Sequence, residues 1–193
     1  MKIGLYFGSF NPIHAGHLII ANYILNETDI KKIWFIVSPQ NPLKTGSSLL
    51  NEYDRLHLTR LATEGDNRIY VSDIEFKLPR PSYTIETLTY LVEKYPENQF
   101  SLIMGSDSYH NLPKWKNYEI IIKSYPIYVY KRAGPEAKHY FGVAPFLLNA
   151  PLLEVSATEI RNLIKEGKSI RYLVPEKVRE EIEQNRYYKP PLK

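Results

Sequence analysis

Two histidines near the N-terminus are the residues best suited to chemistry. His14 and His17 follow an apolar run, residues 3–7, and lie where a loop should pass into a helix. Residues three apart at the start of a helix share a face, so both imidazoles should point the same way, beside the free N–H groups of the helix. Such a position binds anions, and imidazoles suit an anion whose charge grows during a reaction. Two histidines without any cysteine are too few ligands for zinc.

Residues 8–17 also carry a longer pattern. They read Gly-Ser-Phe-Asn-Pro-Ile-His-Ala-Gly-His, which resembles the G-S/T-F-D/N-P-x-H-x-G-H signature of the nucleotidyltransferase superfamily. The resemblance implies that both histidines are catalytic: they bind ATP phosphates and stabilise the transition state of adenylyl transfer. It also implies ATP contacts from the three residues that begin the signature, Gly8, Ser9 and Phe10. The alternative is a Gly/Pro turn with two incidental histidines, which a ten-residue match disfavours.

Two residues near this turn depart from the family pattern. Phe7 stands where many members have glycine, and Asn11 stands where many have aspartate. The pair Asn11–Pro12 predicts a turn. The departures do not affect the class of protein, but they leave the detailed shape of the turn undetermined.

A parallel α/β sheet would place the histidines at a ligand-binding edge. Apolar runs at 3–7 and 33–37, separated by an apolar helix over 18–25, predict a βαβ unit with a right-handed crossover. In such sheets ligands bind outside the carboxyl ends of the strands. The first turn lacks G-x-G-x-x-G, which excludes the dehydrogenase version. We predict a three-layer α/β/α, Rossmann-like nucleotidyltransferase fold, with further strands at 69–71, 99–104, 125–130 and 146–150 and helices at 49–64, 118–123 and 173–184.

Composition limits the class of protein. A chain of 193 residues, 44% hydrophobic and 24% charged, predicts one soluble domain spanning residues 1–193. The absence of a long apolar run, of a signal peptide and of cysteine favours a cytoplasmic protein without a membrane partner. The net charge of +4, without a run of Lys and Arg, suits polyphosphate substrates better than nucleic acid. Homo-oligomerisation is left open.

Residues 38–44 resemble a loop of one branch of the superfamily, the nicotinate-nucleotide adenylyltransferases. They read S-P-x-N-P-x-K and follow the second expected strand, so they leave from the ligand edge of the sheet. The resemblance implies that Asn41 and Lys44 contact the substrate. By composition alone, Lys44 is as readily a solvated loop lysine.

Residues 82–88, S-Y-T-x-x-T-L, mark a loop followed by a helix start. Ser82 or Thr84 could cap that helix, and its free N–H groups could hold a carboxylate or a phosphate. The resemblance implies that backbone N–H groups of Tyr83 and Thr84 hold the carboxylate of nicotinate. It also implies that Trp115 stacks on the pyridine ring, although composition alone favours a core tryptophan.

Two further segments point to ATP. The carboxylate of Asp107 follows Gly105 at the end of an expected strand, where it could hold Mg²⁺ or a ribose hydroxyl, or cap a helix. The family has G-x-D here, which implies ATP contacts from both residues, with Asp107 as the candidate Mg²⁺ ligand. Residues 156–161 predict a capping box and resemble S-x-T-x-I-R, the second phosphate element of the superfamily. The resemblance therefore implies phosphate contacts from Ser156, Thr158 and Arg161. The guanidinium of Arg161 can donate bidentately to phosphate oxygens.

Several other residues are assigned to packing or solvent. Arg55 and His57 are expected at the surface or in packing rather than in the site. Lys131 and Arg132 are expected at a solvated strand end, with a phosphate contact as the alternative. Residues 187–193 are expected to form a loose tail.

Together these motifs cover nearly the whole chain and resemble bacterial nicotinate-nucleotide adenylyltransferases. The resemblance implies transfer of AMP from ATP to nicotinate mononucleotide, with Mg²⁺, to give deamido-NAD and pyrophosphate in NAD biosynthesis. Enzymes that prefer nicotinamide mononucleotide or phosphopantetheine are alternatives. A nucleotide- or RNA-binding module, which the pI of about 9.0 permits, is disfavoured by the intact histidine pair. A class I aminoacyl-tRNA synthetase would need a longer chain and a K-M-S-K-S loop.

Overall fold

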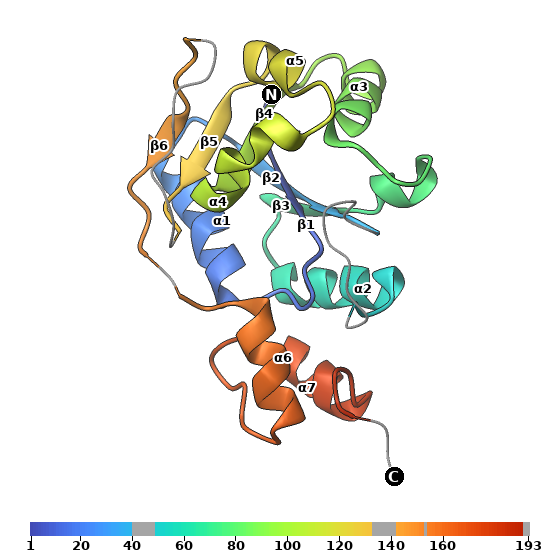
Figure 1. Cartoon of the computed structure of the whole chain (residues 1–193). Helices are drawn as coiled ribbons and strands as arrows, with labels where there is room; N and C mark the ends of the chain where they lie inside the picture. The colour runs from blue at the N-terminus through green and yellow to red at the C-terminus, as the bar shows by residue number, and fades with distance from the viewer. Residues whose placement is uncertain (40–48, 133–141, 153, 191–193) are drawn as a thin grey trace.

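The computed structural model describes residues 1–39, 49–132, 142–152 and 154–190. Its centre is a parallel sheet in which the strands lie in the order β3-β2-β1-β4-β5-β6 (Figure 1). The strands are β1 (Lys2–Gly8), β2 (Lys32–Val37), β3 (Ile69–Ser72), β4 (Gln99–Gly105), β5 (Ile127–Tyr130) and β6 (Phe146–Leu148). The strand order reverses between β1 and β4, so the carboxyl ends of these two central strands form the crevice where ligands bind in such sheets.

Helices cover both faces of the sheet and make the three predicted layers. They are α1 (Ala15–Glu27), α2 (Glu52–Thr63), α3 (Thr84–Lys94), α4 (Ser106–His110), α5 (Tyr118–Ser124), α6 (Ala157–Lys165) and α7 (Glu176–Gln184), with short 3₁₀ turns η1 (Ile74–Lys77) and η2 (Leu112–Lys114). None of the helices in the described part of the chain is long and apolar enough to span a membrane.

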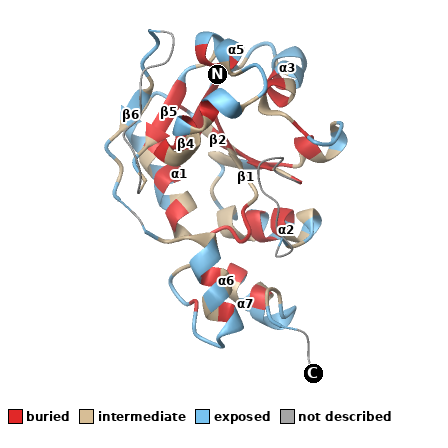
Figure 2. Cartoon of the chain, in the orientation of Figure 1, coloured by how far each residue is buried: buried red, intermediate tan, exposed pale blue. Residues whose placement is uncertain are grey.

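Two apolar clusters, one on each face of the sheet, hold the layers together. The first cluster joins the sheet to α1, α2, α6 and α7, and the second joins it to α3, α4 and α5. Neighbouring strand residues enter opposite clusters: Phe35 lies in the first and Ile36 in the second, as the two-residue period of a strand requires. Figure 2 shows β5 largely buried, whereas β6 at the edge of the sheet is exposed. The predicted α/β/α architecture is therefore confirmed.

Helix α2 is shorter than predicted and turns an arginine towards the core. Asn51 caps it by accepting a hydrogen bond from the Tyr53 N–H at 2.9 Å, so the helix begins at Glu52 instead of residue 49. Tyr53 is exposed, whereas Arg55 is completely buried. A guanidinium therefore occupies the inward face at this point of the helix.

Residues 187–193 were expected to form a loose tail, and this expectation is wrong for Tyr187 and Tyr188. Tyr187 and Tyr188 pack against the first cluster, and the Tyr187 hydroxyl donates to Asp54 Oδ1 at 3.1 Å. Arg55 and Arg161 lie near Tyr188, and their charges oppose the rise that burial causes in its pKa. Two aromatic rings bury enough apolar surface to offset the entropy of ordering a short segment.

Because Tyr188 packs through its ring and its buried hydroxyl has no hydrogen-bond partner in the described structure, we expect Tyr188→Ala to lower the free energy of unfolding by about 2 kcal/mol. Tyr188→Phe keeps the ring and should cost nothing, since no hydrogen bond is lost. Urea unfolding at pH 7.5 measures both. Equal stability of the alanine variant and the wild type would mean that the tail is loose after all.

Candidate active site

The two histidines lie together at the start of α1. His14 is the N-cap residue, and its ring centroid is 3.7 Å from that of His17, with the rings tilted by 32°. The His14 N–H donates to His17 Nδ1 at 3.3 Å. The prediction that both imidazoles share one face is confirmed. The helix end is less open than expected, because the Ala15 N–H already donates to the Leu173 carbonyl at 2.8 Å.

His14 is buried and uncharged at neutral pH. Burial, and then the positive charge of Arg132, lower the pKa of His14 from 6.5 to about 4. Its Nδ1 atom is buried without a hydrogen-bond partner among the described residues. Gly16 leaves room for the ring, since a Cβ there would lie 3.1 Å from the imidazole. A neutral imidazole whose Nδ1 has no partner can still donate a hydrogen bond to a ligand or accept one from it.

The turn before the histidines is held by the ring of Phe10. Phe10 has a φ of 43° and is buried, with edge-to-face contacts to Tyr6, Phe35 and His17. These contacts hold a bulky residue in the left-handed region, where few side chains are found. A Cβ at Gly8 would lie 2.8 Å from the Phe10 ring, so only glycine fits there.

The side chain of Asn11 completes the turn by accepting a hydrogen bond. Its Oδ1 accepts a hydrogen bond from the Leu50 N–H at 3.1 Å. An aspartate, the residue found in many family members, could accept the same bond. The departure at Asn11 is therefore compatible with the turn.

The second phosphate motif meets the first across 150 residues of sequence. Ser156 caps α6 by accepting from the Glu159 N–H at 3.1 Å, as predicted. Arg161 donates to the Asn11 carbonyl at 2.7 Å and to Thr158 Oγ1 at 3.2 Å. These contacts use some of the five N–H donors of the guanidinium. The segments bearing the two motifs therefore lie side by side.

A cleft opens beside the histidine pair, at the carboxyl ends of β1 and β5. It is lined by Tyr6, His14, His17, Tyr130, Arg132 and Val155 among others. Lys131 and Arg132 were expected at a solvated strand end, with a phosphate contact as the alternative, but both line this cleft. The Nη1 atom of Arg132 lies 3.3 Å from Asp107 Oδ2. The place of both residues directly after a strand, at the ligand edge, was the signal that could have identified them.

Gly105 and Asp107 lie at the end of β4, next to Arg132. A Cβ at Gly105 would lie 2.5 Å from Asp107 Oδ1 and 2.6 Å from Arg132 Cδ, so a side chain cannot be accommodated without a shift. Asp107 lies in the first turn of the short helix α4 and is not its N-cap. The carboxylate and the guanidinium therefore approach each other across a glycine at the central crevice of the sheet.

The predicted substrate-binding residues Tyr83 and Thr84 form the start of α3. Tyr83 is the N-cap, with φ −111° and ψ 139°, and Thr84 is the first helical residue. The first N–H groups of a helix have no partner within it. Lys116 lies over the Tyr83 ring at 4.6 Å, so the Trp115 segment adjoins this helix start. Trp115 itself is partly buried against the second cluster.

Asn41 and Lys44, the other predicted substrate contacts, lie outside the described residues.

Comparisons with known proteins identify the family of this chain. The family model of cytidylyltransferase-like proteins matches residues 5–163. The probable nicotinate-nucleotide adenylyltransferase of Flavobacterium johnsoniae is 53% identical over 98% of this chain and 100% of the relative, and that of Cytophaga hutchinsonii is 51% identical over 97% and 98%. The chain belongs to the cytidylyltransferase-like family, in the branch of the nicotinate-nucleotide adenylyltransferases. The resemblance drawn from the motifs is confirmed.

Solved structures agree on the fold of this branch. The nicotinic acid mononucleotide adenylyltransferase of Plasmodium falciparum complexed with NaAD superposes with a TM-score of 0.79 over 97% of both chains, at 19% sequence identity. At that identity the likeness concerns the fold alone.

The crevice offers little to a metal ion by itself. Asp107 Oδ1 is buried without a partner, while Oδ2 is shared with Arg132. In the described part of the chain, no group of three or more His, Cys, Asp or Glu side chains could hold a metal. A single carboxylate oxygen fits a Mg²⁺ ion that is held mainly by substrate phosphates, which is the usual arrangement for this ion in nucleotide-binding sites.

Glu75 supports the start of α3 and was missed by the sequence interpretation. It is buried and accepts hydrogen bonds from the hydroxyls of Ser82 at 3.1 Å and Thr87 at 2.9 Å. Burial raises the pKa of Glu75, and hydrogen bonds from Ser38, Thr87 and Ser82 oppose the rise. Ser82 was expected as a possible helix cap, but its hydroxyl donates to the Glu75 carboxylate instead.

The lowered pKa of His14 predicts a loss of stability in acid. Between pH 6.5 and 4 the unfolded chain binds a proton at this residue that the folded chain does not, so unfolding becomes easier as the pH falls. At pH 5 the difference is about 2 kcal/mol. We expect His14→Gln to lose that much less stability than the wild type between pH 7.5 and pH 5, measured by urea unfolding.

His57→Gln, which changes an exposed histidine on α2, gives the background effect of removing an imidazole. Identical pH dependence of the His14→Gln variant and the wild type would contradict a buried, neutral His14.

Proposed function

We propose that this protein transfers the AMP moiety of ATP to nicotinate mononucleotide, giving deamido-NAD and pyrophosphate. The observation that carries the proposal is the hydrogen bond from Arg161 to the Asn11 carbonyl, 2.7 Å long, because it joins the two phosphate motifs beside the histidine pair. The names of the most similar relatives support the choice of acceptor.

The reaction needs no nucleophile from the protein. An oxygen of the 5′-phosphate of the mononucleotide attacks the α-phosphorus of ATP, and the bond from that phosphorus to the bridging oxygen of the β-phosphate breaks. The electron pair leaves with pyrophosphate. Catalysis then consists of positioning and of stabilising charge on the phosphates.

The residues around the cleft divide this work. His14 and His17 bind the reacting phosphates, and the negative charge of ATP raises the low pKa of His14 towards protonation. The backbone of residues 8–10 contacts ATP. The backbone of Gly105 and Asp107 contacts ATP as well. The remaining phosphate contacts come from Ser156, Thr158 and Arg161, and Arg132 adds a further positive charge in the cleft.

Mg²⁺ bound to the phosphates would supply positive charge that offsets the leaving pyrophosphate, and Asp107 is the residue that would hold it.

The acceptor lies at the start of α3. The backbone N–H groups of Tyr83 and Thr84 hold the nicotinate carboxylate, which suits the positive end of a helix. Trp115 stacks on the pyridine ring, and Asn41 and Lys44 complete the acceptor side. A nicotinamide group has no negative charge to offer there, so the nicotinate form is preferred.

Replacing His17 should slow turnover. We expect His17→Ala to lower kcat for pyrophosphate release by about 10²-fold, since one stabilising contact to the transition state is lost. The control His57→Ala changes a histidine that is bonded to Glu181 at the surface and should keep the wild-type rate. A His17→Ala variant as fast as the wild type would remove His17 from the catalytic residues.

The acceptor site can be tested through a backbone atom. Thr84→Pro removes one N–H and fits the fold, because proline is favoured at the first helical position and Tyr83 already has the extended backbone that precedes proline. We expect KM for nicotinate mononucleotide to rise about 10-fold or more, as for a lost hydrogen bond to a charged group. Thr84→Ala keeps the N–H and should leave KM unchanged.

The same assay ranks the acceptors. With ATP and Mg²⁺, we expect the wild type to prefer nicotinate over nicotinamide mononucleotide by about 10²-fold and to reject phosphopantetheine. Equal use of both pyridine nucleotides would keep the reaction and discard the carboxylate contact. Absence of pyrophosphate release with every acceptor would overturn the proposed function.

A further inference from the structure

Arg55 on α2 is buried completely, yet its guanidinium contacts backbone carbonyl oxygens from three separate parts of the chain. We infer that Arg55 is a positioning residue for adenylyl transfer. It holds the loop after β1, which leads to the histidines, against Ser38 and Pro39 at the end of β2. The inference rests on the function proposed above.

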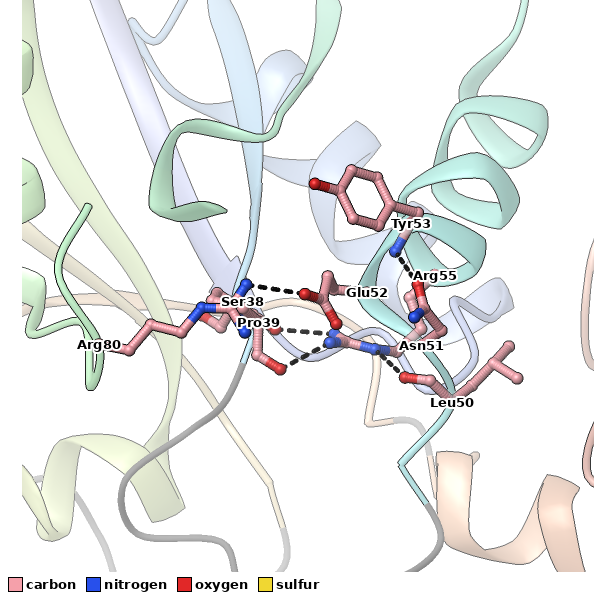
Figure 3. Close-up of polar contacts among 8 residues, drawn as sticks. All are labelled: Ser38, Pro39, Leu50, Asn51, Glu52, Tyr53, Arg55 and Arg80. Atoms are coloured by element: carbon pink, nitrogen blue, oxygen red, sulfur yellow. Dashed lines mark hydrogen bonds and ion pairs between the residues drawn. The ribbon is translucent and has the colours of Figure 1, made fainter. Parts of the chain in front are cut away.

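The contacts of Arg55 join three segments that are separate in the sequence. Nε donates to the Leu50 carbonyl at 2.8 Å, and Nη2 donates to the Pro39 carbonyl at 2.8 Å. Nη1 donates to the carbonyls of Ser9 at 2.5 Å and Ser38 at 2.8 Å. Figure 3 shows the contacts to Leu50, Ser38 and Pro39. Leu50 leads into α2, Ser9 follows β1, and Ser38 and Pro39 follow β2.

The acceptors are neutral, which makes this arrangement unusual for a buried charge. The nearby carboxylate of Glu52 is bonded to Arg80 at 2.7 Å (Figure 3). The hydrogen bonds that Arg55 makes within the described part of the chain go to backbone carbonyls and not to an acidic side chain. Burial lowers the pKa of Arg55, but a guanidinium stays charged. Its planar fork can donate in several directions at once, which an ammonium on a single atom cannot match.

The loop of the histidines is therefore held by two arginines from different helices. Arg55 on α2 binds the carbonyl of Ser9, and Arg161 on α6 binds the carbonyl of Asn11. Ser9 stands between Gly8 and Phe10 in the signature. Movement of this loop by about 1 Å would misplace the phosphates relative to the histidines, and such an error can cost about 10² in rate.

A merely structural role would lower stability without changing the rate of the folded protein. A positioning role predicts a slower folded protein. Two variants distinguish these roles. Arg55→Met removes all of the hydrogen-bond donors, and Arg55→Lys keeps the positive charge but can donate in fewer directions. Arg60→Met changes an exposed arginine on the same helix. Ile24→Ala opens a cavity in the first cluster, towards the end of α1 that is opposite the histidines, and serves as a destabilised control.

For each variant, urea unfolding first establishes a temperature at which it is folded. Pyrophosphate release then gives kcat and KM, and calorimetry gives Kd for α,β-methylene-ATP. We expect Arg55→Met to lower kcat about 10²-fold and to weaken binding of the analogue about 10-fold. Arg55→Lys should recover part of kcat, and the two controls should stay within about threefold of the wild type.

The inference is overturned if folded Arg55→Met keeps the wild-type kcat and analogue affinity, or if Ile24→Ala loses as much of both. If Arg55→Met does not fold, Arg55→Lys decides by the same criteria. If the wild type releases no pyrophosphate with any acceptor, the proposed function fails separately. In that case the affinity for the analogue alone decides the role of Arg55 in placing the loop.

Discussion

The loop between β1 and α1 places two of its carbonyl oxygens against guanidinium groups that come from elsewhere in the chain. Arg55 binds the Ser9 carbonyl and Arg161 binds the Asn11 carbonyl. A buried carbonyl that loses its donor costs about 1–3 kcal/mol, so the shape of this loop and the positions of α2 and α6 depend on each other. His14 follows the loop directly, and the place of the histidine pair therefore depends on two helices that are remote in sequence.

The electrostatics of the cleft follow from the same placement. Arg132 lines the cleft, and its positive charge adds to the effect of burial in lowering the pKa of His14. The acidic group at the crevice, Asp107, shares its carboxylate with Arg132. A positively charged cleft of this kind favours a polyphosphate.

The sequence predicted the sheet well because strands are apolar runs between turn residues, and that signal is local. It predicted the paired histidines and the Ser156 cap for the same reason, since both depend on spacing within one helix turn. It left open whether Arg55 lies at the surface or in packing, because a period of apolar residues treats arginine as polar. A guanidinium enters a core only when other segments supply acceptors, and the acceptors here come from loops that lie far along the chain.

The amino-acid sequence by itself determined the order of strands and helices, the phosphate motifs and the family, since each of these depends on residues that are close to one another in the sequence. Only the tertiary structure decided that Arg161 meets the Asn11 carbonyl, that the Phe10 ring excludes a side chain at position 8, and that His14 loses its charge. These properties depend on burial and on partners from distant segments. Neither exists until the parallel sheet brings the carboxyl ends of its strands to one edge.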